Sequence, residues 1–324
     1  MRPRRSISLG VRVLVAAALV GAWVTAASVS PAEPAPAGRA SDCESSAMPG
    51  ASTQTIDVQG VPRQYRLAVP SEPTGKRRLP LILNFHGGGR NDALHANYSE
   101  LEDKGPARGF VVITPNAGSP PSWGAGPDVR FAEVRDNNLA FTSALIDNAK
   151  ASLCIDTHRI YATGFSSGAA MSAYLGCKPS RQIAAIAPVA GVNLVAPCPD
   201  GKPMSVVAFH GTADPEVAYE GGPAPCCPNI DLLSGDAAVR AWAQRAECRT
   251  KPSRKSIGTQ VERIAYRGCD NSTDVVLYKV ANGAHNWPGS FELDDLGLPT
   301  QDINAADLIL DFFVHHPPSK HAKS

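Results

Sequence analysis

The fold is decided by the stretch RIYATGFSSGAA, residues 159–170. Residues 159–163 have the composition of a buried strand, and 167–176 are small residues typical of a closely packed helix. Between them, Gly164-Phe165-Ser166-Ser167-Gly168 matches G-x-S-x-G. A serine on a sharp turn between strand and helix projects from the sheet, and the helix N-terminus beside it favours negative charge. The motif predicts Ser166 as a nucleophile; the alternative is a small-residue turn that only permits close packing.

The chain around this motif alternates short apolar runs with longer amphipathic ones. Continuous apolar runs are typical of strands buried on both faces. The pattern predicts an α/β fold, in which a mostly parallel sheet is covered by helices on both faces, as a single domain. Strands are predicted at 64–69, 79–85, 110–114, 159–163, 204–209 and 275–280, and helices at 136–152, 167–176, 237–247 and 305–314.

A glycine run, His86-Gly87-Gly88-Gly89, follows the strand predicted at 79–85. Acyl transfer needs two N–H donors aimed at the oxygen that becomes an oxyanion, and glycine lets the backbone approach that point. We therefore predict that Gly87 or Gly88 supplies one donor and that Ser167 supplies the other. A flexible loop is the alternative for an isolated glycine run.

The general base is found by elimination, because the order of a triad in the α/β-hydrolase fold is serine, acid, histidine. His285, in a loop after the strand at 275–280, is the predicted base. His210 ends a strand and precedes the best acid, while the remaining histidines lie at the C-terminal tail. Five histidines follow Ser166 in the sequence: His210, His285, His315, His316 and His321.

The predicted acid is Asp214, which follows the strand at 204–209 in the segment Gly211-Thr212-Ala213-Asp214-Pro215. A carboxylate there accepts the imidazole N–H and fixes the tautomer of the base. Asp231 and Asp274 are competitors. Asp231 lies deeper in a segment interpreted as an irregular loop, and Asp274 begins a strand, at the wrong end of the sheet.

Composition narrows the class of protein further. The 324 residues are 43% hydrophobic and 19% charged, as expected of a globular domain. There are 31 Lys and Arg against 30 Asp and Glu, a net charge of +1, so the basic surplus of a nucleic-acid-binding protein is absent. Without the four arginines of the N-terminal segment, the net charge is 1 − 4 = −3. A net charge this small indicates no particular charged partner.

The N-terminal segment resembles a secretory signal peptide, with a basic start, an apolar stretch over 13–27 and a possible cleavage site at Thr25-Ala26-Ala27. We predict a signal peptide over 1–27, a flexible Pro/Ala-rich leader over 28–42, a catalytic domain over 43–316 and a tail over 317–324. The chain is thus expected to be secreted. An uncleaved membrane anchor is the alternative, but the apolar stretch is shorter than the roughly 20 residues a spanning helix needs.

Eight cysteines, all after the leader, indicate an oxidising compartment and up to four disulfides. The chain has neither C-x-x-C nor H-E-x-x-H, and adjacent Cys226 and Cys227 are poorly spaced for one tetrahedral zinc. No metal or other cofactor is expected.

Together these motifs resemble the secreted esterase family of polyhydroxybutyrate depolymerases and feruloyl or acetylxylan esterases. The resemblance covers about 54–287 and includes the glycine run, the segment from Cys154 to Ser166, and His285-Asn286-Trp287-Pro288-Gly289. It implies an α/β-hydrolase fold with Ser166, Asp214 and His285 as nucleophile, acid and base. The chain departs from the family at Ser167-Gly168-Ala169, where Asn-Gly-Gly or a similar sequence is usual.

The resemblance also implies a disulfide between Cys248 and Cys269. A second pair, Cys177 with Cys198, brackets the strand predicted after the nucleophile helix. Cys43, Cys154, Cys226 and Cys227 remain unassigned.

The expected function is that of a serine esterase acting through an acyl-enzyme on a polyester oligomer or an acylated plant-wall polysaccharide. A serine peptidase on the same scaffold and a non-catalytic binding protein are the alternatives. Trp123 and Trp287, with Tyr98 and Phe291, are placed in loops near the site, where aromatic rings stack on a ferulate or sugar ring or serve only in packing. No nucleic acid and no stable membrane anchor are expected as partners.

Overall fold

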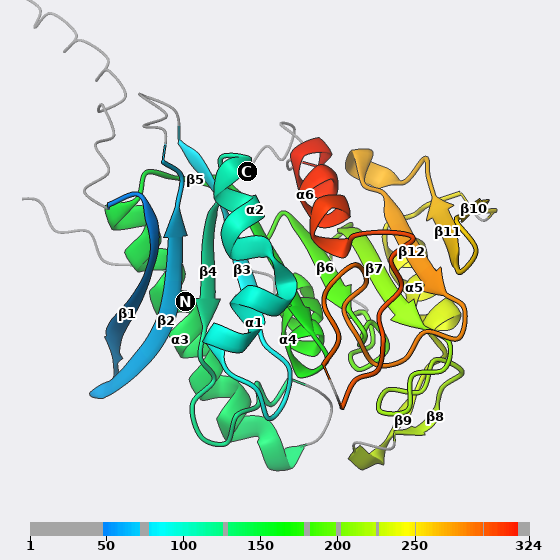
Figure 1. The fold of residues 1–324 in the computed structure, drawn as a ribbon, viewed down its shortest axis with the longest axis horizontal. Helices are drawn as coiled ribbons and strands as arrows, with labels where there is room; N and C mark the ends of the chain where they lie inside the picture. The colour runs from blue at the N-terminus through cyan, green and yellow to red at the C-terminus, as the bar shows by residue number, and fades with distance from the viewer. Residues whose placement is uncertain are drawn as a thin grey trace, which may run out of the picture. The chain divides into compact units, whose positions relative to one another are not determined.

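One ten-stranded sheet forms the centre of the part of the chain that the computed structural model describes, namely residues 48–71, 78–125, 129–177, 182–198, 202–224, 227–249, 251–293 and 295–316. The predicted signal peptide, leader and tail, together with Cys43 and Cys226, lie outside these residues. The strands follow the order β1-β2-β4-β3-β5-β6-β7-β12-β11-β10 across the sheet (Figure 1).

The middle of the sheet is parallel and its two edges are antiparallel hairpins. Strands β4, β3, β5, β6, β7 and β12 pair in parallel, whereas β1 and β2 precede them and β11 and β10 follow as antiparallel neighbours. A separate hairpin pairs β8 with β9. The strands are β1 (Gly50–Val58), β2 (Val61–Val69), β3 (Leu79–Phe85), β4 (Val111–Pro115), β5 (Ile155–Phe165), β6 (Ala185–Val189), β7 (Ser205–Gly211), β8 (Gly222–Ala224), β9 (Cys227–Leu232), β10 (Ser253–Ile257), β11 (Val261–Tyr266) and β12 (Val275–Val280).

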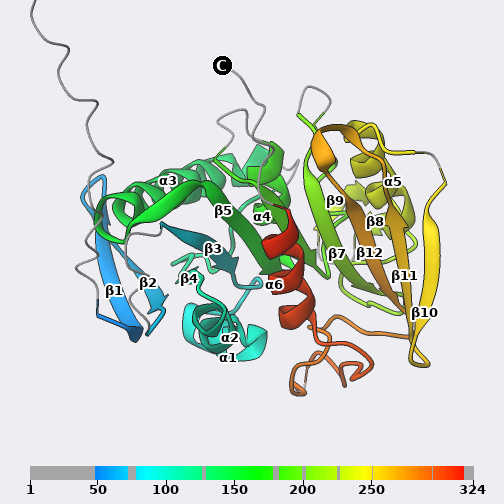
Figure 2. The ribbon, with the colours of Figure 1, turned by 90° about the horizontal axis from the view of Figure 1, so that it is seen from above.

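Helices cover both faces of the sheet. Figure 2 shows α3, α4 and α5 on one face and α1, α2 and α6 on the other. The helices are α1 (Asp92–Ser99), α2 (Leu101–Ala107), α3 (Ala132–Ser152), α4 (Ser167–Cys177), α5 (Gly235–Arg245) and α6 (Ala305–His315), with short 3₁₀ turns at Val129–Phe131 and Asp270–Ser272. This arrangement confirms the predicted α/β class and its covered parallel sheet.

The alternation of side chains along each strand creates two hydrophobic cores. On β3, Leu81 and Leu83 pack into the core beneath α3, α4 and α5, whereas Ile82 packs into the core beneath α1, α2 and α6. Successive strand residues face opposite sides, so a strand buried on both faces must be apolar throughout. This explains why the central strands were evident in the sequence.

The elements that sequence patterning did not predict are mostly at the edges. Strand β1 and strand β10 are largely exposed and polar, as edge strands often are, so their residues show no continuous apolar run. Helices α1 and α2 are only 8 and 7 residues long. Asp231 lies in strand β9 rather than in an irregular loop.

Two disulfides lie on the described residues: Cys177 with Cys198, and Cys248 with Cys269. The first joins the end of α4 to the segment after β6, and the second joins the residues after α5 to the turn before β12. Cys154 is also disulfide-bonded. Cys43 and Cys226 lie outside the described residues. Cys227 is described only through its backbone in β9.

No helix within the described ranges combines the length and the apolar character needed to cross a bilayer.

The Cys248–Cys269 bond closes a loop of sequence separation 21 that contains the exposed edge strand β10. Its removal by a Cys248→Ser/Cys269→Ser double substitution should destabilise the fold by roughly 3 kcal/mol, because the unfolded chain regains loop entropy. The Tm measured by calorimetry should fall by roughly 5–10 °C. A Ser256→Ala variant in the same loop is the control and should keep the Tm of the unaltered protein. A double variant that melts within a degree of the unaltered protein contradicts the prediction.

Candidate active site

The G-x-S-x-G turn adopts the strained geometry that its sequence predicts. Ser166 has φ = 54°, in the left-handed region that residues with a Cβ rarely adopt, and it separates β5 from α4. A Cβ added at Gly164 or Gly168 would lie 2.6 Å or 2.1 Å from the backbone oxygen of Phe85. Only glycine therefore allows β5 and α4 to approach the end of β3 this closely. The Ser166 residue is partly exposed at the start of α4.

Asp214 and His285 come together from the ends of β7 and β12. The distance between His285 Nδ1 and Asp214 Oδ2 is 2.7 Å, and both side chains are buried. The other carboxylate oxygen of Asp214 accepts from the backbone N–H groups of Glu216 at 2.9 Å and Val217 at 2.8 Å. With Asp214 accepting at Nδ1, the Nε2 atom of neutral His285 is left as a proton acceptor.

The carboxyl group of Asp214 stays ionised although it is buried. Burial disfavours the charged form, but hydrogen bonds from His210 and His285 outweigh burial and hold the pKa of Asp214 well below its ordinary value. His210 Nε2 lies 3.3 Å from Asp214 Oδ2 and 2.9 Å from the Val217 carbonyl oxygen, to which it donates. His210 therefore supports the predicted acid and does not replace His285.

The His285 imidazole lies beside the nucleophile turn. Its ring centroid is 4.7 Å from that of Phe165, the residue that directly precedes Ser166. The predicted nucleophile, acid and base thus lie at the carboxyl edge of the parallel strands, although Ser166 and Asp214 are 48 positions apart in the sequence and Asp214 and His285 are 71 positions apart.

The predicted oxyanion loop is held by the side chain of His86. The backbone N–H of Ala117 donates to His86 Nε2 at 3.0 Å, so the ring proton is on Nδ1, which donates to the Gly87 carbonyl oxygen at 2.7 Å. Burial lowers the pKa of His86 and keeps this neutral tautomer. Two more bonds fix the loop: Trp123 Nε1 donates to the His86 carbonyl oxygen at 2.8 Å, and the Gly89 N–H donates to Pro121 at 2.9 Å.

This arrangement fixes the direction of the Gly88 N–H group. In a trans peptide the C=O and the following N–H point in opposite directions. Because the Gly87 carbonyl points toward His86, the Gly88 N–H points away from it. A Cβ at Gly88 would lie 3.8 Å from the Ser167 Cβ, which places Gly88 next to the other predicted donor residue.

The two predicted substrate-binding tryptophans are buried instead of lining an open site. Trp123 is 0% exposed and Trp287 is 1% exposed. Trp123 packs edge-on against Phe85 at 4.9 Å, and its indole N–H is used by the His86 carbonyl. Neither ring has a free face for a substrate, so the expectation that they stack on one is corrected. Trp123 supports the predicted oxyanion loop through the His86 carbonyl, and Trp287 is packed in the loop that carries His285, against His95.

Tyr98 and Phe291 form the remaining aromatic pair near His285, with ring centroids 5.5 Å apart. Tyr98 lies in helix α1 rather than in a loop, and it is buried. Its hydroxyl accepts from the backbone N–H of Trp287 at 2.9 Å, and its backbone carbonyl oxygen accepts from the Ser290 hydroxyl at 2.6 Å. Phe291 is 48% exposed and is the member of this group whose ring meets solvent.

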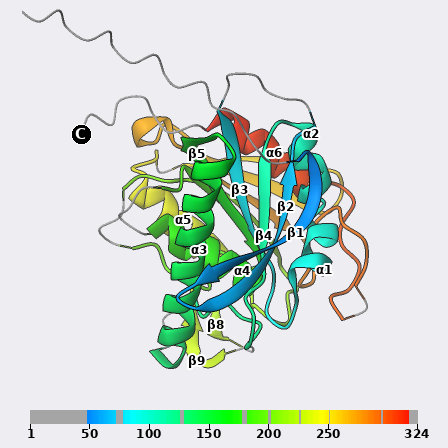
Figure 3. The same ribbon diagram turned by 90° about the vertical axis from the view of Figure 1, so that its left-hand side faces the viewer.

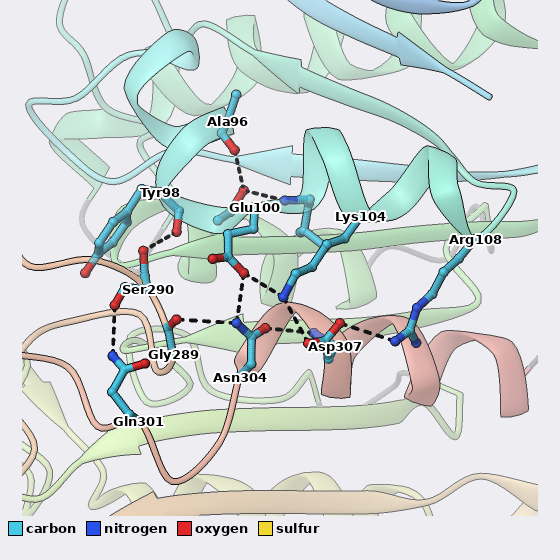
Figure 4. Close-up of polar contacts among 12 residues, drawn as sticks. Ala96, Tyr98, Glu100, Lys104, Arg108, Gly289, Ser290, Gln301, Asn304 and Asp307 are labelled. Atoms are coloured by element: carbon cyan, nitrogen blue, oxygen red, sulfur yellow. Dashed lines mark hydrogen bonds and ion pairs between the residues drawn. The ribbon is translucent and has the colours of Figure 1, made fainter. Parts of the chain in front are cut away.

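Polar contacts tie the histidine loop, defined here as residues 281–304, to helices α1 and α2 (Figure 4). Asn304 Nδ2 donates to Glu100 Oε2 at 2.8 Å, and Lys104 pairs with Glu100 at 2.7 Å and with Asp307 at 2.9 Å. Partly exposed ion pairs contribute little stability one by one. The ion pairs of Lys104 join α2 to Glu100 and to α6, whereas the hydrogen bonds of Asn304 to Glu100 and of Ser290 to Tyr98 join the histidine loop to this region.

Asp274, a competitor for the acid, lies at the opposite end of the sheet. Its carboxylate contacts His316 Nε2 at 3.2 Å, and its carbonyl oxygen accepts from the Val206 N–H at the start of β7. This is the strand end at which the sequence located it, away from His285.

Sequence reasoning missed the roles of His86, His210 and Tyr98. His86 directly precedes the glycine run and His210 directly precedes the segment that holds Asp214, so adjacency was the available signal for both. Tyr98 offered no local signal, because its hydroxyl bonds to a residue 189 positions away.

Comparison with known proteins finds that this chain is similar to feruloyl esterases. Over 233 residues, 69% of this chain and 42% of the relative, the chain is 28% identical to feruloyl esterase B of Piromyces equi. It is also 28% identical to a probable feruloyl esterase C of Aspergillus oryzae, over 73% of this chain and 83% of that one. The chain thus spans less than half of the first relative and most of the second. No protein-family model matches it.

Solved structures support the fold. An acetyl xylan esterase from Aspergillus awamori has a TM-score of 0.54 at 14% identity and covers 82% of this chain and 99% of its own. Esterase 2 of Thermogutta terrifontis has a TM-score of 0.52 at 16% identity, with coverages of 83% and 95%.

These findings show the α/β-hydrolase fold and support a serine ester hydrolase. The chain is related to the feruloyl and acetylxylan esterases. They do not favour a peptidase or a non-catalytic binding protein.

A buried histidine beneath the histidine loop should make stability depend on pH. His95 Nε2 bonds to Asn84 Oδ1 at 2.9 Å, its ring lies 5.6 Å from that of Trp287, and burial lowers the pKa of His95 to about 3. Between pH 6.5 and about 3 the unfolded chain binds a proton that the native state does not bind. The free energy of unfolding therefore falls with decreasing pH, by up to about 1.4 kcal/mol per unit for this group.

A His95→Gln variant should lose this contribution. Urea unfolding between pH 6 and pH 4 should show a slope smaller by about 1.4 kcal/mol per pH unit than that of the unaltered protein. The control is exposed His158→Gln, which should leave the slope unchanged. Equal slopes in the His95 and His158 variants rule out the assignment of the titration to His95.

Proposed function

We propose that this protein is a secreted carboxylic ester hydrolase that removes feruloyl or acetyl groups from plant-wall polysaccharide. Ser166 is the nucleophile, His285 the base and Asp214 the acid. The observation that carries the proposal is the 2.7 Å contact between His285 and buried Asp214 beside the left-handed turn of Ser166.

Acylation begins when His285 Nε2 removes the proton of the Ser166 hydroxyl and Oγ attacks the ester carbonyl carbon. Asp214 holds the Nδ1 proton and stabilises the imidazolium that forms. The same imidazolium then protonates the departing alcohol, which leaves an acyl-enzyme on Ser166 Oγ. Water activated by His285 attacks the acyl carbon and releases the acid and free Ser166.

The oxyanion formed in each half-reaction is stabilised by the N–H groups of Gly88 and Ser167. The Ser167 N–H is at the first turn of α4, where the helix dipole adds to the favourable field. His86 acts as a positioning residue, since its Nδ1–H holds the Gly87 carbonyl and so orients the Gly88 N–H. No metal or cofactor takes part in the proposed steps.

The substrate class is supported by the relatives and by the wall of the site. The matched relatives are named feruloyl esterases and a bifunctional acetylxylan esterase/xylanase. Half-exposed Phe291, which follows His285 in the same loop and packs against Tyr98, offers a ring face that suits a ferulate ring. A polyhydroxybutyrate oligomer is the competing substrate, suggested by the family resemblance of the motifs.

Secretion belongs to the same proposal. A signal peptide over 1–27 and a leader over 28–42 precede the catalytic domain at 43–316, and a tail over 317–324 follows it. Disulfide-bonded cysteines on the described residues suit an oxidising compartment. N-terminal sequencing of the mature protein tests where the signal peptide is cleaved.

Substitution of the nucleophile is the first test of the chemistry. Ser166→Ala should fold normally and lose ester hydrolysis by on the order of 10⁶ in kcat, the loss expected when a serine triad is disabled. An aryl sulfonyl fluoride should label the unaltered protein at Ser166 and should not label the variant, as read by mass spectrometry of peptides. The control is Ser152→Ala, at the exposed end of α3, which should be labelled and active. A labelled peptide without Ser166 refutes the assignment.

The substrate assignment is tested by parallel hydrolysis of methyl ferulate, acetylated xylan and hydroxybutyrate oligomers. The proposal expects kcat/KM for one of the first two to exceed that for hydroxybutyrate oligomers by at least tenfold, or about 1.4 kcal/mol in transition-state binding. A preference for the oligomers refutes the plant-wall substrate and leaves the esterase chemistry intact.

A further inference from the structure

The carboxylate of Asp214 has four neighbours that offer an N–H group, and they divide between its two oxygens. Oδ1 accepts from the backbone N–H groups of Glu216 and Val217. Oδ2 lies 2.7 Å from His285 Nδ1 and 3.3 Å from His210 Nε2. A second histidine, which belongs to no part of the proposed triad, therefore contacts the same oxygen as the predicted base.

His210 also holds the turn that carries Asp214. Its Nε2–H donates to the Val217 carbonyl oxygen at 2.9 Å, while the Val217 N–H donates to Asp214 Oδ1 at 2.8 Å. The three residues form a closed ring of contacts at the end of β7. The segment 214–221 contains no helix or strand and leads into the β8–β9 hairpin, which Figure 3 shows at the lower end of the fold, below α4 and α5. Contacts such as this ring therefore position the acid.

The His210 ring presents a single tautomer to its acceptors. Its side chain is 0% exposed, and its buried Nδ1 atom has no hydrogen-bond partner within the described residues. A proton on Nδ1 would lack an acceptor, which is costly for a buried donor, whereas a proton on Nε2 has the Val217 carbonyl oxygen and the Asp214 carboxylate beside it. The donor thus points toward the acid in the folded protein.

Aromatic packing fixes this ring between the strands that precede the acid and the base. The Tyr219 ring meets the His210 ring edge-on, with the centroids 5.4 Å apart. Lys279 Nζ lies 4.6 Å from the centre of the Tyr219 ring and 3.2 Å from Asp236 Oδ2 on α5. Because Lys279 is on β12, the strand that leads into the histidine loop, the position of His210 is tied to both strands.

The charge on Asp214 responds to His210 as well as to His285. Burial raises the pKa of Asp214, but hydrogen bonding from His210 and from His285 lowers that pKa by more, to well below its ordinary value. An N–H group at Oδ2 competes with His285 for the negative charge of this oxygen. The carboxylate is therefore a weaker proton acceptor for His285 than it would be alone.

Other ionisable groups surround this cluster, but among the described residues only the two histidines act on the Asp214 carboxylate. The surrounding groups come from the acid's own segment, from β10, β12 and α5, and from the far side of the histidine loop. They are Glu216, Tyr219, Glu220, Arg254, Lys279, Asp236, Tyr98 and His95.

From these contacts we infer that His210 is a positioning residue for ester hydrolysis, which orients the Asp214 carboxylate and limits how strongly it attracts the proton of His285. The inference rests on the proposed function. Without His210 the carboxylate would turn more easily and would favour the imidazolium form of His285 before any substrate reacts. Because kcat/KM requires the neutral base, activity would then be lost at a higher pH as the solution is acidified.

Two substitutions separate the N–H donor from the shape of the ring. His210→Leu removes the donor, and His210→Gln places an amide N–H at the position of Nε2. For each variant, kcat/KM for 4-nitrophenyl acetate is measured as a function of pH. In His210→Leu the midpoint of the acid limb should move up by about 0.5 to 1 pH unit, which is a roughly three- to tenfold lower kcat/KM below the midpoint. His210→Gln should return the midpoint to that of the unaltered protein.

A second variant without the donor is His210→Asn, whose shorter amide replaces Nδ1 rather than Nε2. It should show the same shift as His210→Leu. The control is His158→Leu, at an exposed histidine on β5, which should leave the midpoint unchanged. A merely structural role of His210 would lower the Tm and the plateau rate but would not move the midpoint, and that result overturns the inference.

A spectroscopic measurement separates this inference from the proposed function. The proton between His285 Nδ1 and Asp214 is observed at low field by NMR at acid pH, without any substrate. Its signal should shift in His210→Leu and His210→Asn and return in His210→Gln. If the unaltered protein hydrolyses no ester but this pattern holds, the proposed function fails and the role of His210 at the acid stands. If esters are hydrolysed but neither the signal nor the midpoint moves, the inference about His210 fails alone.

Discussion

The close approach of three backbone segments at the nucleophile turn is the constraint on which the site depends. The end of β5, the start of α4 and the end of β3 meet where a Cβ at Gly168 would lie 2.1 Å from the Phe85 carbonyl oxygen. This contact holds Ser166 at a positive φ, a conformation that costs about 1–3 kcal/mol and persists only when its surroundings enforce it. Because the residue after Phe85 begins the glycine run, the same contact sets the position of the oxyanion loop relative to Ser166. One steric requirement therefore aligns two of the three parts of the proposed chemistry.

The third part, the acid and base, depends on electrostatics. Asp214 is buried yet ionised, because His285 and two backbone N–H groups donate to its carboxylate and His210 Nε2 lies 3.3 Å from it. A buried carboxylate with this many donors is fixed in position and orients the imidazole that it contacts. The histidine loop cannot hold that imidazole by local structure, since 281–304 contains no helix and within the described residues only an isolated bridge between Leu293 and Gly297. Its order comes from contacts with α1 and α2, through Tyr98 and Glu100.

Whether a feature could be predicted from the sequence depends on how far apart in the chain the interacting residues lie. The central strands and the Ser166 turn were predictable, because burial on both faces requires continuous apolar runs and the turn requires glycine at 164 and 168. The buried state of Trp123 was not predictable, because it results from packing against Phe85 and from a hydrogen bond to His86, 37 positions away. Their position in predicted loops made Trp123 and Trp287 resemble substrate-binding residues. In the structure both side chains are buried and pack against other residues. Edge strands β1 and β10 were not predicted, because an exposed strand has no continuous apolar run.

The loop from Asn116 to Gly124 connects strand β2 to the predicted oxyanion loop. Its Ala117 N–H fixes the tautomer of His86, its Trp123 supports the His86 carbonyl, and its Asn116 and Ala117 carbonyls receive Arg63 from β2. A displacement of this loop would move the predicted oxyanion donors, since their position depends on these hydrogen bonds. Arg63 thus has an influence on the site although it lies on a strand near the sheet edge.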